Sequence, residues 1–341
     1  MIRDVKKFSR NKEYVLMKNK SEKNFIMSFR KFYSQKFAPW LRRLPYGERL
    51  NMALVALSTD LQISNALYPY SFENKYFTDN EIEDVFTGLD VLSIELAKRF
   101  MARQIRLPKE CFFIHPKYFY TVEEQEEYKK LFPEYKKMCR KFGFPEGKVG
   151  VESLYYHHGL RFAPEFVKKN IAGKLFADVG GYWGDSTLVF MNYSPEKVII
   201  FEPLEDCRKK LVRVLNKSEI DPDCYAIHPF ALSDKKETLD NLECRPLDDF
   251  TANYTTPFGV LKADIEGMGL KFVQGAEKTI RKDRPLLSLA IYHNEHEFAG
   301  IYKLLKGWNL DYHFELKQFS PLIPGGELTL FAYPNEWVSK N

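Results

Sequence analysis

The chain reads Lys174-Leu-Phe-Ala-Asp-Val-Gly-Gly-Tyr-Trp-Gly-Asp-Ser-Thr187 near its centre. A short apolar run ends in the carboxylate of Asp178, and a glycine-rich turn then leads into a helix start, which is how a parallel sheet presents a nucleotide-like ligand. The next apolar run, Lys197-Val-Ile-Ile-Phe201, predicts a second buried strand and is followed by Glu202, 24 positions after Asp178. That spacing fits one crossover from strand through helix to strand. The two runs therefore predict neighbouring strands of a doubly wound sheet.

The glycine turn favours a cofactor without phosphate groups. A dinucleotide-binding turn uses the pattern GxGxxG so that backbone N–H groups can approach a pyrophosphate. Here Val179 occupies the first glycine position and Asp178 precedes the turn, where a carboxylate would repel phosphate. S-adenosylmethionine carries an ammonium, a sulfonium and a ribose but no phosphate, so carboxylates suit it. The alternative is an ordinary strand-to-helix turn without a ligand, and Glu202 argues against it.

Composition excludes several classes of protein. The chain has 341 residues, 45% of them hydrophobic, so it can bury a large core, and no apolar run approaches the length that spans a bilayer. The first ten residues lack the apolar centre of a signal peptide, and the five cysteines form no CxxC pair. We therefore expect reduced thiols, a cytoplasmic location and no zinc site.

Positive charge gathers at the N-terminus. The net charge is +5, but residues 1–50 hold fourteen Lys or Arg against four Asp or Glu. We predict a basic N-terminal arm over residues 1–45, with a solvated tail as the favoured interpretation. Contact with an anionic membrane surface, a nucleic acid or an acidic partner is the alternative.

A helical region is predicted over residues 46–150. Thr78 with Glu81 and Thr121 with Glu124 have the spacing of capping boxes, so each pair predicts a helix start. Pro133 is expected to break the second helix. After the first box, apolar residues recur at the spacing of one helix face: Ile82, Val85, Phe86, Leu89, Leu92, Leu96 and Phe100.

From about residue 171 onward, predicted strands alternate with predicted helices, which is typical of an α/β fold with a parallel sheet. Only Lys317 to Glu327 separates the last two strands, so we expect them to form an antiparallel hairpin. The prediction is a doubly wound, mostly parallel seven-stranded sheet with an antiparallel edge strand, the order of a class I methyltransferase, over residues 151–341. The strands are predicted at 174–178, 197–201, 224–228, 259–264, 286–292, 309–315 and 328–333, and the helices at 185–192, 204–218, 268–282 and 295–306.

Several separated motifs occur in order within residues 150–335. They are His157-His-Gly-Leu160, Asp178 to Thr187, Phe201-Glu-Pro203, Pro246-Leu-Asp-Asp-Phe250, Leu261-Lys-Ala-Asp-Ile-Glu-Gly267, Gly275-Ala276, Pro285 and Ser288-Leu-Ala-Ile-Tyr-His-Asn294. Together they resemble the FkbM family of S-adenosylmethionine-dependent methyltransferases. The departures are conservative: Gly181 stands where the family commonly has alanine, and Ala263 and Ile265 replace other small or branched residues. The helices before residue 150 lie outside the resemblance.

The resemblance implies an O-methyltransferase that acts on a hydroxyl of a sugar, a glycan or a related natural product. The expected partner is that small-molecule or glycan acceptor; no nucleic acid is expected, and a homo-oligomer remains open. Two alternatives of other classes are a nicotinamide-dependent oxidoreductase of similar architecture and a non-catalytic subunit that binds S-adenosylmethionine or a glycan. RNA methylation is a weaker contender because no basic patch interleaved with aromatics appears in the catalytic half.

Cofactor-binding residues are predicted around the glycine turn and the ends of the next two strands. Ser186 has N-capping of the helix as its alternative role, and Tyr182 and Trp183 either line the pocket or belong to the core. We expect the backbone of Gly180, Gly181 and Gly184 to approach the cofactor, and Asp178 to make its surroundings acidic. Asp185 and Ser186 are expected to contact the methionine end of the cofactor, and Glu202 its ribose. Ser233 and Asp234 are expected to contact its adenine.

Methyl transfer requires an aligned acceptor oxygen and a group that takes its proton. We expect His293 or Asp264 to be this base, because His293 has a reference pKa near neutral and Asp264 follows a strand at the carboxyl edge. Glu266 is expected to orient the acceptor. It lies two positions after Asp264, so in a strand the two side chains would share a face. His158 is expected to fold over the same edge. Each of these residues has an alternative role. His158 and His293 could be structural histidines, and Asp264 and Glu266 could cap the following helix. A magnesium site formed by these carboxylates with His293 and Asn294 is less favoured.

Overall fold

The computed structural model describes residues 72, 76–110, 120–145, 148–251, 254–319 and 326–340. The predicted basic arm over residues 1–45 lies outside the described residues, as does the chain up to residue 71. The chain divides into one compact unit of residues 1–69 and 106–114 and a second of residues 70–105 and 115–341. The features below belong to the second unit. The predicted boundary at residue 150 stays a prediction.

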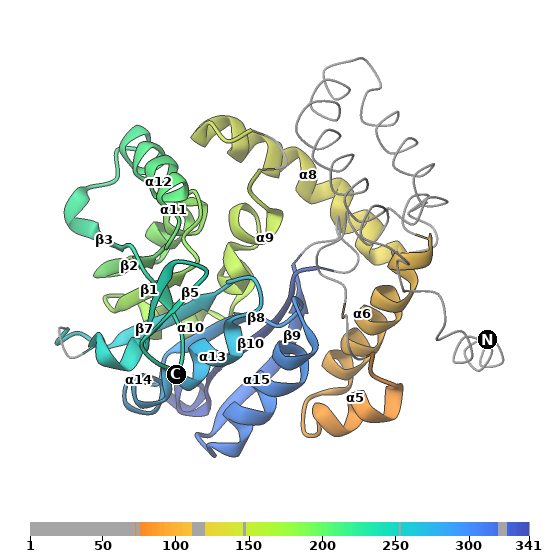
Figure 1. The fold of residues 1–341 in the computed structure, drawn as a ribbon. Helices are drawn as coiled ribbons and strands as arrows, with labels where there is room; N and C mark the ends of the chain where they lie inside the picture. The colour runs from red at the N-terminus through yellow and green to blue at the C-terminus, as the bar shows by residue number, and fades with distance from the viewer. Residues whose placement is uncertain are drawn as a thin grey trace, which may run out of the picture. The chain divides into compact units, whose positions relative to one another are not determined.

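A seven-stranded sheet organises this unit (Figure 1). Its strand order is β3-β2-β1-β7-β8-β10-β9, and neighbours from β3 to β8 pair in parallel. This is the predicted class I methyltransferase arrangement, and the fold class is confirmed. The strands are β1 (Leu175–Val179), β2 (Lys197–Phe201), β3 (Tyr225–His228), β7 (Phe258–Ala263), β8 (Leu286–Ala290), β9 (Tyr312–Gln318) and β10 (Leu328–Pro334).

The predicted antiparallel hairpin forms one side of the sheet. β10 is antiparallel to both β8 and β9 and lies between them, so the strand at the very edge is β9. Burial explains the placement: all seven residues of β10 are buried, whereas β9 has partly exposed positions. A strand that is apolar along its whole length avoids solvent by taking the inner place.

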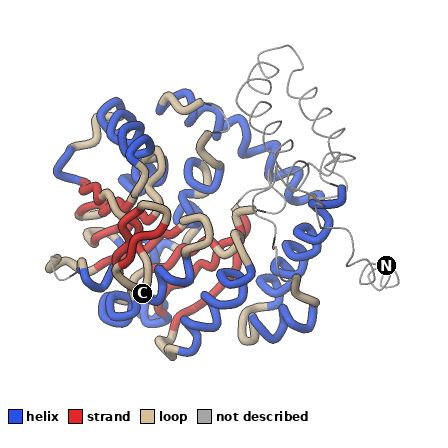
Figure 2. Tube along the Cα trace, in the orientation of Figure 1, coloured by secondary structure: helices blue, strands red, loops and turns tan. Residues whose placement is uncertain are grey.

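Helices cover both faces of the sheet, as the tube in Figure 2 shows. α13, α14 and α15 contribute to one hydrophobic cluster, and α10, α11 and α12 contribute to the other. The predicted helix over 268–282 is two helices that are separated at Gly275, where a side chain would overlap the Ser233 carbonyl. The bounds are α10 (Glu165–Ile171), α11 (Asp185–Phe190), α12 (Glu205–Lys217), α13 (Gly269–Gln274), α14 (Glu277–Asp283) and α15 (Glu295–Gly307).

A small second sheet was not anticipated from the sequence. It has the order β4-β6-β5, with β4 (Ala231–Leu232), β5 (Glu237–Leu239) and β6 (Leu242–Arg245). Its strands are two to four residues long, too short for an alternating pattern to predict them.

Both predicted capping boxes are present in the helical region. They open α5 (Asp79–Val85) at Thr78 and α8 (Val122–Phe142) at Thr121. The prediction of one apolar helix face over residues 82–100 is wrong. α5 ends at Val85, and α6 (Val91–Glu110) begins after a turn. Leu92, predicted on the buried face, is 82% exposed. Gly88 has a φ of 95°, which a helix does not allow.

The predicted helix break at Pro133 is also wrong. α8 continues through Pro133 to Phe142, and Leu131, Tyr135 and Cys139 form its buried face. Packing of that face outweighs the lost backbone hydrogen bond. In the described part of the chain, no helix combines the length and the apolar character needed to cross a membrane.

Candidate functional site at the carboxyl edge of the sheet

The glycine turn lies where β1 meets α11, and its glycines are required by space. Gly180 has a φ of 82°, and a Cβ there would overlap the carbonyl oxygen of Asp264. A Cβ at Gly181 would overlap Ile200, and Gly184 has a φ of 84° directly before α11. Packing against neighbouring residues therefore requires glycine at these positions, and backbone approach to a cofactor there stays a prediction.

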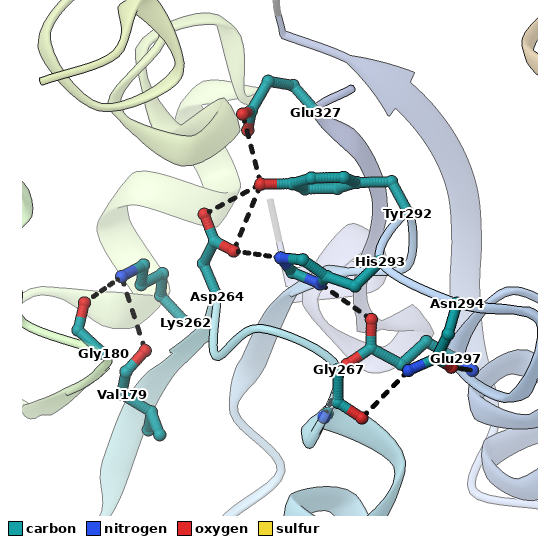
Figure 3. A network of polar contacts seen from close by, with 11 residues as sticks. Val179, Gly180, Lys262, Asp264, Gly267, Tyr292, His293, Asn294, Glu297 and Glu327 are labelled. Carbon is teal, nitrogen blue, oxygen red and sulfur yellow. Dashed lines mark hydrogen bonds and ion pairs between the residues drawn. The ribbon is translucent and has the colours of Figure 1, made fainter. Parts of the chain in front are cut away.

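Asp178 and Lys262 form a buried ion pair beneath this turn. Asp178 is fully buried, and its carboxylate accepts from Thr187 Oγ1 at 2.8 Å and from Lys262 Nζ at 3.1 Å. Lys262 Nζ also donates to the carbonyl of Gly180 at 2.8 Å (Figure 3). The pair thus fixes the turn from below. Direct contact of Asp178 with a cofactor stays a prediction.

Glu202 holds the same turn from the end of β2. Its carboxylate accepts from the backbone N–H of Tyr182 at 2.9 Å and of Leu204 at 2.8 Å. Burial raises the pKa of Glu202, while these two hydrogen bonds oppose the rise. A carboxylate has about four acceptor positions, so two remain for ribose hydroxyls.

Asp185, Ser186 and His158 meet at the start of α11. Ser186 Oγ lies 2.8 Å from His158 Nε2, so His158 does fold over the edge as predicted. Ser186 is not the N-cap, because that position is Gly184. Burial lowers the pKa of His158 well below its usual value and raises that of Asp185. His158 is therefore neutral and paired with a hydroxyl.

Ser233 and Asp234 lie beside the small sheet. Ser233 follows β4 and donates to Asp234 at 3.0 Å, and its carbonyl packs against Gly275. Their predicted contact with adenine stays a prediction. At the end of β3, the ring of His228 stacks on Phe201 with centroids 5.4 Å apart.

A chain of polar contacts runs across the ends of β7, β8 and β10 (Figure 3). His293 Nε2 lies 3.1 Å from Asp264 Oδ1, and His293 Nδ1 lies 2.8 Å from Glu297 Oε2. The Tyr292 hydroxyl donates toward Asp264 at 3.3 and 3.5 Å and toward Glu327 at 3.2 Å. The sequence predicted that Asp264 and His293 would come together, and they do.

The charges in this chain oppose the predicted role of His293. Burial alone would lower its pKa, but Asp264 and Glu297 on either side of the ring raise it to about 10. Burial alone would raise the pKa of Asp264, but the hydrogen bond and charge of His293, with the charge of Lys262, lower it to about 2. At neutral pH the ring already carries its proton. A protonated ring opposes the predicted use of His293 as the base, and that role stays a prediction.

Glu266 and Asn294 differ from their predicted surroundings. β7 ends at Ala263, so Asp264 and Glu266 do not share a strand face; Glu266 is exposed and has a φ of 53°. Asn294 caps α15 by accepting from Glu297 N at 2.9 Å and donates to the Gly267 carbonyl at 3.2 Å. Within the described ranges, no group of three or more His, Cys, Asp or Glu is arranged to hold a metal ion.

The sequence analysis did not identify four polar residues of the site. Lys262 and Tyr292 lie inside motifs that were singled out, and Glu297 lies four residues after His293, a spacing that indicates contact within a helix. Glu327 had no such signal, because it follows a loop outside every motif.

Comparison with known proteins agrees with this geometry. Residues 225–316 match the family model described as the methyltransferase FkbM domain. The resemblance to that family is thereby confirmed over this segment. Among curated proteins, none matches the sequence.

Solved structures share the fold. The methyltransferase FkbM from Methylobacillus flagellatus KT superposes with a TM-score of 0.53 at 17% identity over 74% of this chain. This chain spans only 58% of that protein. An O-methyltransferase from Bacillus cereus in complex with SAH gives 0.42 at 12% identity, covering 64% of this chain and all of that one (100%). TomG from Streptomyces achromogenes, in complex with SAM, gives 0.40 at 10% identity, covering 65% and 99%. The last two likenesses are too weak to add to the argument.

Proposed function

We propose that this protein is an S-adenosylmethionine-dependent O-methyltransferase whose acceptor is a hydroxyl of a sugar, a glycan or a related natural product. The observation that carries the proposal is the set of carboxylates around the bare glycine turn. Glu202, Asp185 and Asp264 lie at the carboxyl ends of β2, β1 and β7, where a doubly wound sheet binds its ligand. Their charge suits a cationic ligand and opposes a pyrophosphate.

The chain's own residues fit the donor. S-adenosylmethionine supplies a methyl group activated by a positively charged sulfur. Glu202 retains acceptor positions for the ribose hydroxyls. Asp185, buried at the start of α11, would face the ammonium.

Asp264 would orient the acceptor. Its carboxylate is held by His293 and Tyr292, and a side chain fixed from two directions keeps a hydrogen-bond acceptor in a constant place. With a pKa of about 2 it is a weak base. Its role would therefore be to accept a hydrogen bond from a hydroxyl of the acceptor beside the one that is methylated and so to align the acceptor, while Glu266, exposed on the same turn, would contact the acceptor further out.

Two measurements test the function. Calorimetry with S-adenosylmethionine, S-adenosylhomocysteine and NAD should give binding of the first two only. Transfer of radioactive methyl from S-adenosylmethionine to a panel of methyl glycosides should then be lost in Asp264→Asn, while donor binding stays. Asp249→Asn, an exposed aspartate paired with Lys236, is the matched control. Binding of NAD without binding of either sulfur compound would reject the proposal.

The surroundings of the reaction belong to the same proposal. We place the catalytic domain at residues 151–341 and assign acceptor recognition or dimer contact to the helices of residues 46–150. A cytoplasmic location agrees with the free thiols of Cys139, Cys207, Cys224 and Cys244. A membrane-surface contact through residues 1–45 and the oligomeric state are to be tested with the full chain.

A further inference from the structure

Glu327 is a partly buried carboxylate that the reaction outlined above does not use. It directly precedes β10 with a φ of 59°, and its side chain points to the hydroxyl of Tyr292 at 3.2 Å (Figure 3). The same hydroxyl lies 3.3 Å from Asp264. A phenol has one proton and can donate it to one carboxylate at a time. Glu327 and Asp264 therefore compete for a single donor.

Glu152 supplies a further negative charge that acts on Glu327. It lies on α9 (Val151–Leu154), and its carboxylate folds back over Gly150 so closely that a Cβ there would overlap it. In the described part of the chain, the titratable groups that act on Glu327 are Glu152 from α9, Asp264 after β7, and Tyr292 and His293 after β8. Two of the four are carboxylates, so Glu327 stands among like charges.

The proton affinities of these groups separate their roles. Burial, with the charges of Glu152 and Asp264, raises the pKa of Glu327 well above its usual value. Burial, with the charges of Asp264 and Asp185, raises the pKa of Glu152 to about 8. A general base works best when its pKa lies near the operating pH. Asp264 is too weak a base, and the ring of His293 is already protonated.

We propose that Glu327 takes the proton of the acceptor hydroxyl, with Tyr292 holding its carboxylate beside Asp264. This rests on the proposed function. The acceptor O–H bond breaks and its proton forms an O–H bond on Glu327. The oxygen's electron pair forms the new bond to the methyl carbon, and the pair of the broken carbon–sulfur bond stays on sulfur.

The arrangement has a consequence that needs no acceptor. In the donor-free protein, burial and the charges of Glu152 and Asp264 favour the protonated form of Glu327. A positive sulfonium nearby favours its ionised form, so Glu327 gives a proton to solvent on binding S-adenosylmethionine. S-adenosylhomocysteine has a neutral sulfur and lacks this effect.

Calorimetry in two buffers of different ionisation enthalpy measures the protons released. At pH 7 the full-length protein should release about one proton more per molecule of S-adenosylmethionine than of S-adenosylhomocysteine. Glu327→Gln should abolish the difference. Glu152→Gln removes a neighbouring charge, so the pH at which the difference is half-maximal should fall. Glu126→Gln, an exposed glutamate of α8 paired with Lys129, should keep the wild-type difference.

The outcomes are separable from those of the proposed function. If neither sulfur compound binds, the function and this inference fail together. If both bind and release equal numbers of protons, or if Glu327→Gln keeps the difference, the inference fails while the function stands. In the methyl-transfer assay, Glu327→Gln should lose activity by about 100-fold or more with S-adenosylhomocysteine affinity unchanged; full activity overturns the assignment. If Glu327→Gln does not fold, Glu152→Gln provides the test. The assignment of Glu327 is overturned if the pH at which the difference in proton release is half-maximal does not shift in Glu152→Gln.

Discussion

Replacing Lys262 with methionine should cost more stability than any change at a surface lysine. Lys262 is 3% exposed and Asp178 is fully buried, so the substitution leaves a carboxylate in the core without its positive partner. Breaking a buried pair in this way costs about 3–5 kcal/mol. The Thr187 hydroxyl, 2.8 Å from Asp178, remains as a neutral donor and cannot replace a full charge.

The geometry gives a second route to the same magnitude. The Lys262 nitrogen lies 3.1 Å from the carboxylate and 2.8 Å from the Gly180 carbonyl. Two unit charges about 4 Å apart attract each other by about 4 kcal/mol at an effective dielectric constant of about 20. Combining Lys262→Met with Asp178→Asn removes both charges, so the double variant should recover about 1–3 kcal/mol relative to Lys262→Met alone.

Urea unfolding at pH 7, followed by tryptophan fluorescence, measures these free energies. Lys236→Met is the matched control, because Lys236 pairs with Asp249 at 3.2 Å on the surface and should change stability by no more than about 0.5 kcal/mol. A Lys262→Met protein as stable as this control would refute the reasoning. So would a double variant whose loss equals the sum of the two single losses.

Three further outcomes are expected. Gly180→Ala should weaken S-adenosylhomocysteine binding about tenfold or more, because a Cβ at this position would overlap the Asp264 carbonyl. Gly307→Ala is the control and should bind normally, because Gly307 has open space around it. Equal affinities of the two variants would contradict this prediction. Glu202→Gln should also weaken binding about tenfold, because an amide NH₂ would face one of the two backbone N–H groups that the carboxylate accepts from. The pKa of His293 is raised from its ordinary value of about 6.5 to about 10, so the stabilisation from its proton is fully present below pH 6.5 and is lost as pH rises through 10. Urea unfolding at pH 6, 8 and 10 should show a smaller fall in stability for Asp264→Asn than for the unchanged protein, and an equal fall would refute this.

Most strands of the large sheet were predictable because they are short apolar runs. β2 has the predicted bounds, and most others differ by one to three residues. The two capping boxes were predictable for a local reason, since a hydroxyl and a carboxylate three residues apart satisfy each other's backbone. Such features depend on neighbours in the sequence.

Features that depend on distant neighbours escaped prediction. The continuity of α8 through Pro133 reflects packing of its buried face, which no local rule contains. The charge of His293 depends on Glu297 in the next helix and on Asp264 from another strand. Glu327 reaches the site only because β10 takes the place beside β8. Strand endings therefore located the site, whereas its protonation states required the tertiary structure.

The inner position of β10 sets an order for assembly during synthesis. The last strand along the chain separates β8 from β9, which are both made before it. While the ribosome is still adding residues up to Pro334, the sheet has a gap and the unsatisfied backbone of β8 faces it. Glu327 reaches the rim of the site with that same final insertion. A nascent polypeptide halted before this segment would carry the glycine turn and β2 yet lack a finished sheet.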